Sequence, residues 1–320
     1  MPLVDKPLAE LREYRGVSPM PHDFDAFWEK ALAELEATDP QPVLKPTTAI
    51  QPRNAEAFDL WFTGVGGARI YAKYLRPKNP SAAHPAVLNF HGYSGSSADW
   101  QDKLSYVSEG LAMAALDCRG QGGRSEDNTP VKGNTLKGHF IRGLDDAPEK
   151  LLFRSIFLDT AQLARVVMSF EEIDANRIGT FGGSQGGALS VACASLVPSI
   201  KRCVSIFPFL SDYRRVWEMD LAKGAYEELQ TFFRNFDPRH EREEEIFTRL
   251  GYIDIKNLAP RIKAECLFGL SLMDTICPPS TQFAAYNAIT SKKDGIIYPD
   301  FGHEGLPGFS DDAFNFLCQL

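Results

Sequence analysis

The sequence predicts an α/β fold, in which a doubly wound, mostly parallel sheet of about eight strands carries helices on both faces. Three observations predict this fold. Short, continuously apolar segments alternate with helical patterns along most of the chain. Two alternating segments ahead of them are typical of an antiparallel hairpin. A glycine-rich turn around Ser184 joins one apolar segment directly to a helical pattern, as expected where a strand of such a sheet ends.

Residues 1–50 are predicted to form a helical extension ahead of the sheet. Apolar residues recur at helical spacing over residues 22–35, and a cluster of prolines then ends the pattern. Residues 57–63 and 68–75 alternate like strands, with Gly-Val-Gly-Gly between them. This arrangement predicts an antiparallel hairpin at the edge of the sheet.

Six short apolar segments follow the hairpin, and helical patterns separate most of them. Strands that are apolar on both faces are typical of a parallel sheet covered by helices on both sides. The predicted strands are residues 85–92, 111–117, 178–181, 202–206, 265–269 and 295–298.

The longest interruption, residues 212–257, is rich in Glu and aromatic residues. An insertion at this point of the chain would overhang the carboxyl ends of the strands, as a small cap over the site. Alternatively, residues 226–233 form a surface helix that packs on the core, and both descriptions can hold because a cap helix also buries one face. We therefore expect residues 1–320 to form one domain with a cap rather than two domains.

Charge and composition exclude several classes of function. The net charge of −8 argues against a nucleic-acid partner, because neutralising phosphates requires clustered Lys and Arg. The chain has no stretch near the roughly 18 apolar residues of a membrane span, and residues 1–7 do not resemble a secretory signal. We expect a cytoplasmic protein without a membrane partner. Its six scattered cysteines are expected to be reduced core residues: Cys118, Cys193, Cys203, Cys266, Cys277 and Cys318.

Ser184 is the candidate nucleophile. It lies in Gly-Gly-Ser-Gln-Gly-Gly, after an apolar strand and before a helical pattern. Small residues two positions before and after the serine, Gly182 and Gly186, allow the strained turn that presents the hydroxyl at the edge of the sheet. Glycine-rich turns also serve close helix packing or phosphate binding, so the motif alone leaves these alternatives open.

A serine hydroxyl needs a general base and a group that orients this base. His303 follows the last predicted strand, where its loop reaches the same edge of the sheet as Ser184. The other five histidines fit less well: His22 starts a helix, His84 and His91 precede the serine near a strand, and His139 and His240 occupy polar loops.

The acid should lie between the serine and the histidine in the chain, and Asp274 satisfies this order. Asp254 precedes its strand and would lie at the wrong edge, whereas Asp300 is too close to His303 along the chain. An aspartate in such a loop often caps the next helix, but Ser280 offers a cap for that helix.

The negatively charged oxygen of an acyl-transfer intermediate needs two backbone donors. We expect the amide of Gln185, which starts a helix, and that of Tyr93, in the loop after residues 87–90. Tyr93 and Pro208 are further expected to line a small acyl pocket, although the aromatic residues around Pro208 could equally be ordinary core. The motifs of metal and nucleotide sites are absent, so no metal and no cofactor is expected.

Three motifs in this order resemble carbohydrate esterase family 7, the acetyl xylan esterases and cephalosporin C deacetylases. They are Arg-Gly-Gln-Gly at 119–122, the glycine-rich turn at 182–187 and His-Glu at 303–304, and the resemblance covers nearly the whole chain. The resemblance implies an α/β-hydrolase fold and the removal of acetyl groups from short acetylated xylo-oligosaccharides and cephalosporin C. It also implies Ser184, Asp274 and His303 as a triad, Tyr93 and Gln185 as oxyanion donors, and a homohexamer.

The expected reaction passes through an acetyl-serine intermediate, and the expected partner is a small acetylated sugar or cephalosporin. Arg119, in the first motif, is expected to pin neighbouring loops rather than to react. The alternatives are a general short-chain esterase, a peptidase or a dienelactone-type hydrolase on the same fold, and more remotely a binding module that does not catalyse a reaction. The natural acetyl ester and the tolerance for longer acyl chains do not follow from the sequence.

Overall fold

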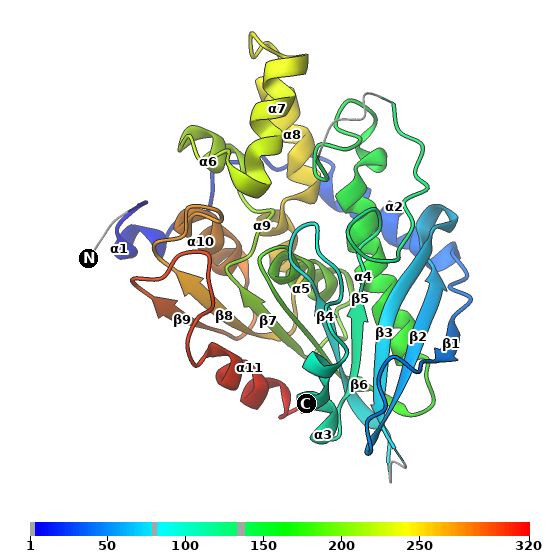
Figure 1. Cartoon of the computed structure of the whole chain (residues 1–320). Helices are drawn as coiled ribbons and strands as arrows, with labels where there is room; N and C mark the ends of the chain where they lie inside the picture. Colours follow the sequence, from blue (N-terminus) through cyan, green and yellow to red (C-terminus); the bar gives the residue numbers. More distant parts are fainter. Residues whose placement is uncertain (1–3, 79–81, 133–137) are drawn as a thin grey trace.

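One mixed sheet runs through the middle of the protein (Figure 1). The computed structural model describes residues 4–78, 82–132 and 138–320, so the first three residues of the expected N-terminal extension lie outside the described residues. Within the described residues the sheet has nine strands, in the order β1-β2-β3-β5-β4-β6-β7-β8-β9. The strands are β1 (Val43–Pro46), β2 (Ala55–Thr63), β3 (Arg69–Pro77), β4 (His84–Phe90), β5 (Ala112–Leu116), β6 (Ile173–Gly183), β7 (Arg202–Ile206), β8 (Glu265–Ser271) and β9 (Lys293–Tyr298).

The predicted hairpin and parallel strands are confirmed. Strands β2 and β3 pair antiparallel, with Phe58 opposite Tyr74, and the turn between them needs glycine because Gly66 and Gly67 have φ of 72° and 79°. From β5 and β4 to β9 all neighbouring strands run parallel. Their carboxyl ends therefore meet along one edge of the sheet.

Strand β1 is not predicted from the sequence and is additional to the eight expected strands. It pairs antiparallel with β2 at the edge of the sheet, with Val43 opposite Trp61. Three of its four residues are exposed, so it has no buried face to produce an alternating pattern, and it ends at Pro46. Pairing with β2, rather than any local signal, makes this segment a strand.

Helices lie between the strands and cover both faces of the sheet. The α-helices of the described residues are α1 (Leu8–Leu11), α2 (Phe24–Ala37), α3 (Leu104–Ser108), α4 (Leu152–Met168), α5 (Gln185–Leu196), α6 (Tyr213–Glu218), α7 (Glu227–Phe236), α8 (Glu243–Leu250), α9 (Ile255–Leu258), α10 (Pro279–Ala288) and α11 (Phe309–Leu317). Single 3-10 turns occur at η1 (Val65–Gly67), η2 (Gln101–Lys103), η3 (Pro148–Lys150), η4 (Gly224–Tyr226), η5 (Gly251–Ile253) and η6 (Ala259–Arg261).

The core is split into two layers by the sheet. Leu88 of β4 packs in the larger layer with α2, α4 and α5, whereas its neighbour Val87 packs in the smaller layer with α3 and α11. This alternation follows from the two-residue period of a strand. Helix α2 confirms the predicted N-terminal helix, because its apolar stripe from Phe24 to Leu35 is buried. The sheet is thus doubly wound, as predicted.

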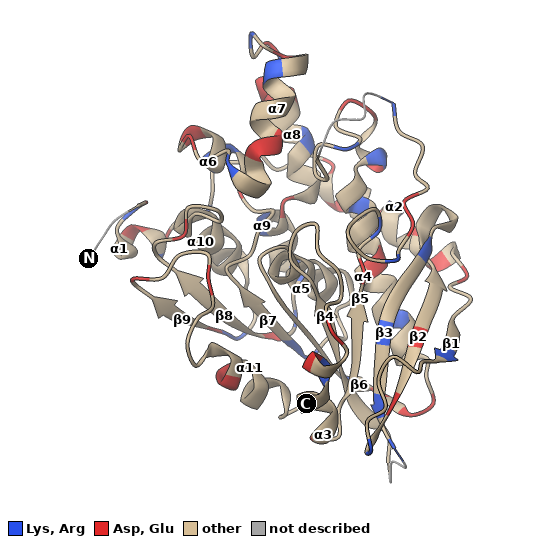
Figure 2. Cartoon of the chain, in the orientation of Figure 1, with Lys and Arg blue, Asp and Glu red and all other residues tan. Residues whose placement is uncertain are grey.

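The insertion at residues 212–257 contains α6, α7 and α8. Helices α7 and α8, yellow in Figure 1, stand beyond the carboxyl ends of the strands. Helix α7 confirms the predicted helix at 226–233 and buries one face, which includes Leu229, Phe232 and Phe233. Acidic and basic residues are mixed along this insertion (Figure 2), and some of them form ion pairs, such as Arg242 with Glu245 at 3.1 Å.

All six cysteines are free, and five of them are buried as expected. Cys318 is only half-buried because it follows the last turn of α11 near the surface. Within the described ranges, every helix is too short or too polar to cross a membrane.

Candidate active site

Ser184 lies in the sharp turn between β6 and α5, as predicted. Its φ of 56° and ψ of −120° are strained for a residue with a side chain. The glycines are required by close contacts: a Cβ on Gly182 would lie 2.4 Å from the backbone of Gly186, and one on Gly186 would lie 2.1 Å from the oxygen of Phe90. The backbone of Ser184 is fixed by hydrogen bonds to Ile206 and from Phe209. The turn therefore holds the side chain at the carboxyl edge of the sheet.

The structure brings Ser184, His303 and Asp274 into one chain of hydrogen bonds, which we call the Ser–His–Asp cluster. His303 Nε2 lies 3.0 Å from Ser184 Oγ, and His303 Nδ1 lies 2.8 Å from Asp274 Oδ2. The Asp274 side chain is fully buried, whereas that of His303 is 24% exposed. This difference in exposure leaves the histidine accessible to a substrate and keeps water away from the carboxylate.

Asp274 is held by the loop that follows β8. Its Oδ1 accepts hydrogen bonds from the backbone amides of Ile276 and Cys277, both at 2.8 Å. With Oδ1 occupied in this way, Oδ2 remains directed at the imidazole. The rival acids lie elsewhere: Asp254 accepts from the backbone of Lys256 at the start of α9, and Asp300 is exposed.

The expected cap at Ser280 is wrong. Helix α10 begins at Pro279, and its N-cap residue Pro278 has no side-chain cap. The amide of Ser280 instead donates to Asp5 Oδ2 at 2.7 Å, from the N-terminal extension. A carboxylate 275 positions away along the chain thus supplies the acceptor that local sequence reasoning assigned to Ser280.

The backbone amides of Gln185 and Tyr93 both lie at the carboxyl edge of the sheet. Gln185 is the first residue of α5, where helix amides have no intrahelical acceptor. Among the described residues, neither amide donates to a protein acceptor. Free backbone donors at this edge of the sheet are what stabilisation of an oxyanion requires.

Gln121 links the two loops that carry these amides. Its side-chain amide and that of Gln185 hydrogen-bond to each other at 3.0 Å, and its Oε1 also accepts from the backbone of Ser94 at 2.9 Å. The sequence predicts only a structural role for the Arg-Gly-Gln-Gly motif. Gln121 was therefore overlooked, although its place in a motif between two predicted donors was a usable signal.

Arg119 of the same motif has the expected pinning role. Its guanidinium is fully buried and makes two 2.6 Å hydrogen bonds to Asp159 of α4. It also donates to the backbone oxygen of Val65 in η1. Arg119 thus joins the end of β5 to α4 and to the hairpin turn.

His91 and His139 both lie closer to the site than the sequence indicated. His91 Nε2 accepts from the backbone of Cys118, and Nδ1 faces the oxygen of Gly92, which together define the neutral Nδ1–H tautomer. The prediction that His139 sits in a polar loop misses its contacts: Nε2 lies 2.8 Å from Ser94 Oγ, and its ring lies 4.8 Å from that of Tyr93. Burial lowers the pKa of both histidines, which favours their neutral forms.

The segment after β7 forms one wall beside His303. The ring of Phe207 lies 4.6 Å from the His303 ring, and Phe207 has a φ of 30°. Pro208 is buried, and Phe209 packs against the rings of Tyr93 and Tyr226. Phe207 therefore contacts the cluster, and the place of Pro208 in an acyl pocket stays a prediction.

Asp274, Cys277 and His303 also place one potential metal ligand each within 4.8 Å of one another. Burial raises the pKa of the Cys277 thiol well above its usual range, so the thiol stays protonated. A metal needs a thiolate and a free imidazole nitrogen, and both nitrogens of His303 already face Asp274 and Ser184. These residues fit a hydrogen-bonded cluster better than a metal site.

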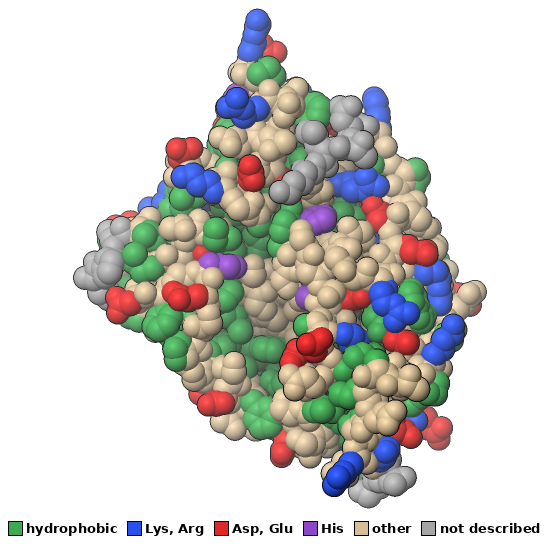
Figure 3. Space-filling model, in the orientation of Figure 1, with side chains coloured by type: hydrophobic (Ala, Val, Ile, Leu, Met, Phe, Trp, Pro, Cys, Tyr) green, Lys and Arg blue, Asp and Glu red, His purple; other side chains and the backbone are tan. Residues whose placement is uncertain are grey.

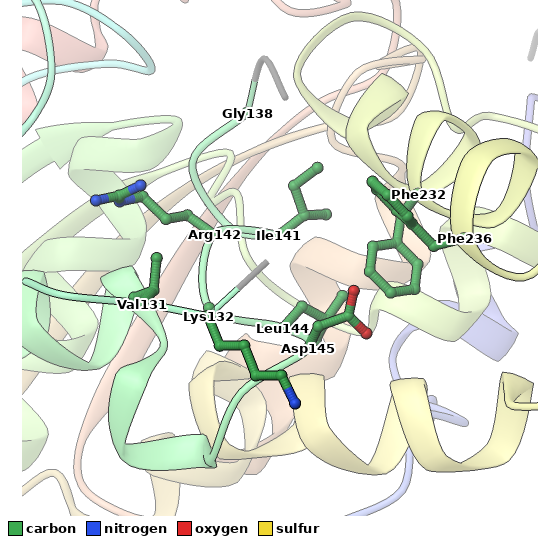
Figure 4. Close-up of a pocket in the computed structure, with 10 residues that line it drawn as sticks. Val131, Lys132, Gly138, Ile141, Arg142, Leu144, Asp145, Phe232 and Phe236 are labelled. Carbon is green, nitrogen blue, oxygen red and sulfur yellow. The ribbon is translucent and has the colours of Figure 1, made fainter. Parts of the chain in front are cut away.

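The surface is hollowed near the middle of the face seen in Figure 3, below the insertion, with histidine and hydrophobic side chains at the edge of the hollow. A separate pocket lies between α7 and two described stretches of the chain, residues 131–132 and 138–145 (Figure 4). Phe232, Phe236 and Arg142 line this second pocket, and no member of the Ser–His–Asp cluster does. It therefore lies apart from Ser184.

Comparisons with known proteins agree with this geometry. The family described as acetyl xylan esterase (AXE1) matches residues 1–320. The crystal structure of acetyl xylan esterase 1 from Thermoanaerobacterium sp. JW/SL YS485 has a TM-score of 0.97 and 57% identity, covering 98% of this chain and 99% of that one. An acetyl xylan esterase from Paenibacillus sp. R4 has a TM-score of 0.93 and 35% identity, covering 98% and 99%.

A curated relative is similar over a shorter share of its own length. The acetyl esterase Axe7A of Xylanibacter ruminicola is 28% identical over 288 residues, which are 87% of this chain. The match spans 62% of that relative. The architecture of this chain is that of α/β-hydrolase esterases, with a mostly parallel sheet wrapped by helices.

Proposed function

The chain belongs to the acetyl xylan esterase family, which consists of carboxylic ester hydrolases, and on this premise we propose that it is a serine esterase that removes acetyl groups from acetylated xylo-oligosaccharides. One observation carries the proposal. Ser184 Oγ, His303 and Asp274 form a continuous chain of hydrogen bonds at the end of a strained turn. Such a chain provides a nucleophile, a general base and the group that orients the base.

In the first half of the reaction, Ser184 Oγ attacks the acetyl carbonyl carbon while His303 Nε2 takes the hydroxyl proton. The carbonyl electrons move to oxygen, and the amides of Gln185 and Tyr93 stabilise this charge. When the tetrahedral intermediate collapses, His303 gives its proton to the leaving sugar oxygen. An acetyl group then remains on Ser184.

In the second half, water replaces the alcohol. His303 removes one proton from the water, which attacks the acetyl-serine, and this proton returns to Ser184 Oγ as acetic acid leaves and ionises in solution. Asp274 keeps the proton of the neutral imidazole on Nδ1 and stabilises the imidazolium that forms twice in each cycle. No metal or organic cofactor takes part in this scheme.

We also propose cephalosporin C as a substrate, because its acetyl ester presents the same small acyl group on a different alcohol. Phe207 beside His303, with Pro208 and Tyr93, would bound the acyl side of the site. The insertion stands beyond the carboxyl ends of the strands and would limit the size of the alcohol side. Short oligosaccharides fit this arrangement better than polymeric xylan.

The resemblance to the family is the sole support for an oligomer, and we propose a homohexamer on that basis. Light scattering of the purified protein tests it. A hexamer has six times the 35.6 kDa mass of the chain. A mass of one chain at micromolar concentration would overturn the proposal.

Initial rates with p-nitrophenyl acetate, butyrate and octanoate, cephalosporin C and acetylated xylobiose test the proposed function, with Ser184→Ala as the control. We expect release of acetate to dominate and to be lost in the variant. A preference for longer acyl chains would indicate a general esterase. Activity that survives in Ser184→Ala would mean that another residue is the nucleophile.

A further inference from the structure

Glu228 of α7 is a buried acid that reaches from the insertion to the loops at the carboxyl edge of the sheet. The residue is only 5% exposed. Its Oε1 accepts a hydrogen bond from the Tyr93 hydroxyl, and its Oε2 accepts from the backbone amide of Ile141 at 3.1 Å. The backbone amides of His139 and Phe140 lie beside the same carboxylate. One side chain thus joins three segments that are distant in sequence.

The described part of the chain around Glu228 offers hydrogen-bond donors but no cation. Among the described residues, no Lys or Arg forms an ion pair with it, and burial raises its pKa to about 8. Gly138 comes so close that a Cβ there would lie 2.6 Å from Glu228 Oε2. An apolar side chain at position 228 would leave the buried amides of 139–141 and the tyrosine hydroxyl without an acceptor, which destabilises buried polar groups.

Tyr93 is fixed on several sides, and Glu228 supplies its polar anchor. Its ring packs edge-on against Phe209 at 5.6 Å and against His139 at 4.8 Å. The next residue, Ser94, is tied to Gln121 through its amide. With the side chain held at the hydroxyl and the backbone held one residue later, the peptide of Tyr93 has little freedom to turn.

We propose that Glu228 is a positioning residue for acetyl transfer: by anchoring the Tyr93 hydroxyl, it sets the direction of the Tyr93 amide that stabilises the oxyanion. The insertion then contributes to catalysis through Glu228, in addition to standing over the site. The inference rests on the proposed function. It differs from a purely structural role because it predicts a loss in kcat that depends on Tyr93.

A double-mutant cycle on p-nitrophenyl acetate tests the proposal, with Tyr93→Phe, Glu228→Ala and the two combined. Tyr93→Phe removes the hydroxyl and keeps the backbone amide. We expect each single variant to lower kcat about 10- to 100-fold with a smaller change in KM, because misdirection of one oxyanion donor acts in the transition state. The double variant should be no slower than the slower single variant, because both changes break the same contact.

Glu228→Gln is the conservative variant that should restore activity. Its amide oxygen can face the backbone amides of 139–141, while its NH₂ group donates to the Tyr93 hydroxyl, so both contacts survive. We expect kcat within about threefold of wild type. Tyr74→Phe is the matched control: it removes a buried tyrosine hydroxyl that donates to Glu172 at 3.0 Å, at the opposite edge of the sheet. It should lower stability and leave kcat unchanged.

Multiplicative losses in the double variant, or a wild-type kcat in Tyr93→Phe, would overturn the inference. If Glu228→Ala does not fold, Tyr93→Phe and Glu228→Gln still test the inference. It requires a lowered kcat in Tyr93→Phe and a kcat near that of wild type in Glu228→Gln. Failure of the proposed function looks different. In that case the wild-type protein itself has no acetate release that depends on Ser184, whereas failure of the inference leaves this activity intact.

Discussion

The side-chain amides of Gln121 and Gln185 hydrogen-bond to each other at 3.0 Å, so the residue after Ser184 is tied to the turn that follows β5. Gln121 also accepts a hydrogen bond from the backbone amide of Ser94. It therefore connects the two segments that carry the proposed oxyanion donors. The hydrogen bonds of Gln121 thus reach both sides of the site, to Ser94 and to Gln185.

Gln121→Ala should lower kcat for p-nitrophenyl acetate about tenfold, with a smaller effect on KM. The physical reason is that both loops lose a shared tether close to the oxyanion site. Gln101→Ala is the control, since the Gln101 side chain is exposed and hydrogen-bonds to its neighbour Asp102. Equal kcat values for the two variants would contradict a positioning role for Gln121.

Asp274→Asn should lower kcat about a thousand- to ten-thousand-fold while the protein remains folded. Asparagine keeps an oxygen for the amides of Ile276 and Cys277, but then its NH₂ group faces His303 Nδ1. This donor forces the histidine into the tautomer that cannot accept the Ser184 proton. Steady-state kinetics and a thermal melt check both parts, and Asp300→Asn, at an exposed position, should behave like wild type.

Arg119→Ala should destabilise the protein by about 3–5 kcal/mol, because it leaves the fully buried carboxylate of Asp159 without its partner. Urea unfolding measures the change. The paired replacement Arg119→Met with Asp159→Leu removes both charges and should recover much of the loss. Arg53→Ala, at an exposed position, serves as the control. A double variant as unstable as Arg119→Ala would show that the charges themselves are needed.

The raised pKa of Glu228 predicts that stability falls as pH rises. The folded protein holds this proton up to a pKa of about 8, whereas the unfolded carboxyl loses it near its ordinary value of 4.5. Between these limits the unfolded state binds fewer protons, so the free energy of unfolding decreases with pH, by at most about 1.4 kcal/mol per pH unit.

Glu228→Gln cannot ionise, so its free energy of unfolding should decline less than that of wild type between pH 5 and pH 8. Urea unfolding at several pH values gives both curves. Glu227→Gln changes an exposed carboxyl on the same helix and should run parallel to wild type. Parallel curves for Glu228→Gln and wild type would mean that Glu228 is ionised in the folded protein throughout this range.

Local patterns were sufficient to predict the sheet and the juxtaposition of Ser184, Asp274 and His303. Each of the three follows the carboxyl end of a strand, and such ends meet at one edge of a parallel sheet. The glycines of the turn could also be explained from the local sequence, because the strained turn at Ser184 leaves no room for a Cβ at Gly182 or Gly186. Apolar runs likewise predicted the strands, because burial on both faces leaves a pattern in the sequence.

The contacts made across the insertion could not be predicted in this way. Glu228 and Tyr93 are 135 positions apart, and nothing in the Glu-rich sequence of α7 indicates which carboxylate turns inward. The same holds for Asp5 at the start of α10 and for β1, which depends on its pairing with β2. In each case the deciding partner comes from another element, so tertiary packing supplies information that local propensity lacks.

The backbone of Ser184 has a consequence for the evolution of such chains. Its positive φ costs about 1–3 kcal/mol in a residue with a side chain, and glycine would adopt the same angles without this cost. A gene copy freed from selection for hydrolysis would therefore gain stability by drifting to glycine at this position. The turn thus places a reactive hydroxyl at Ser184 at the expense of stability.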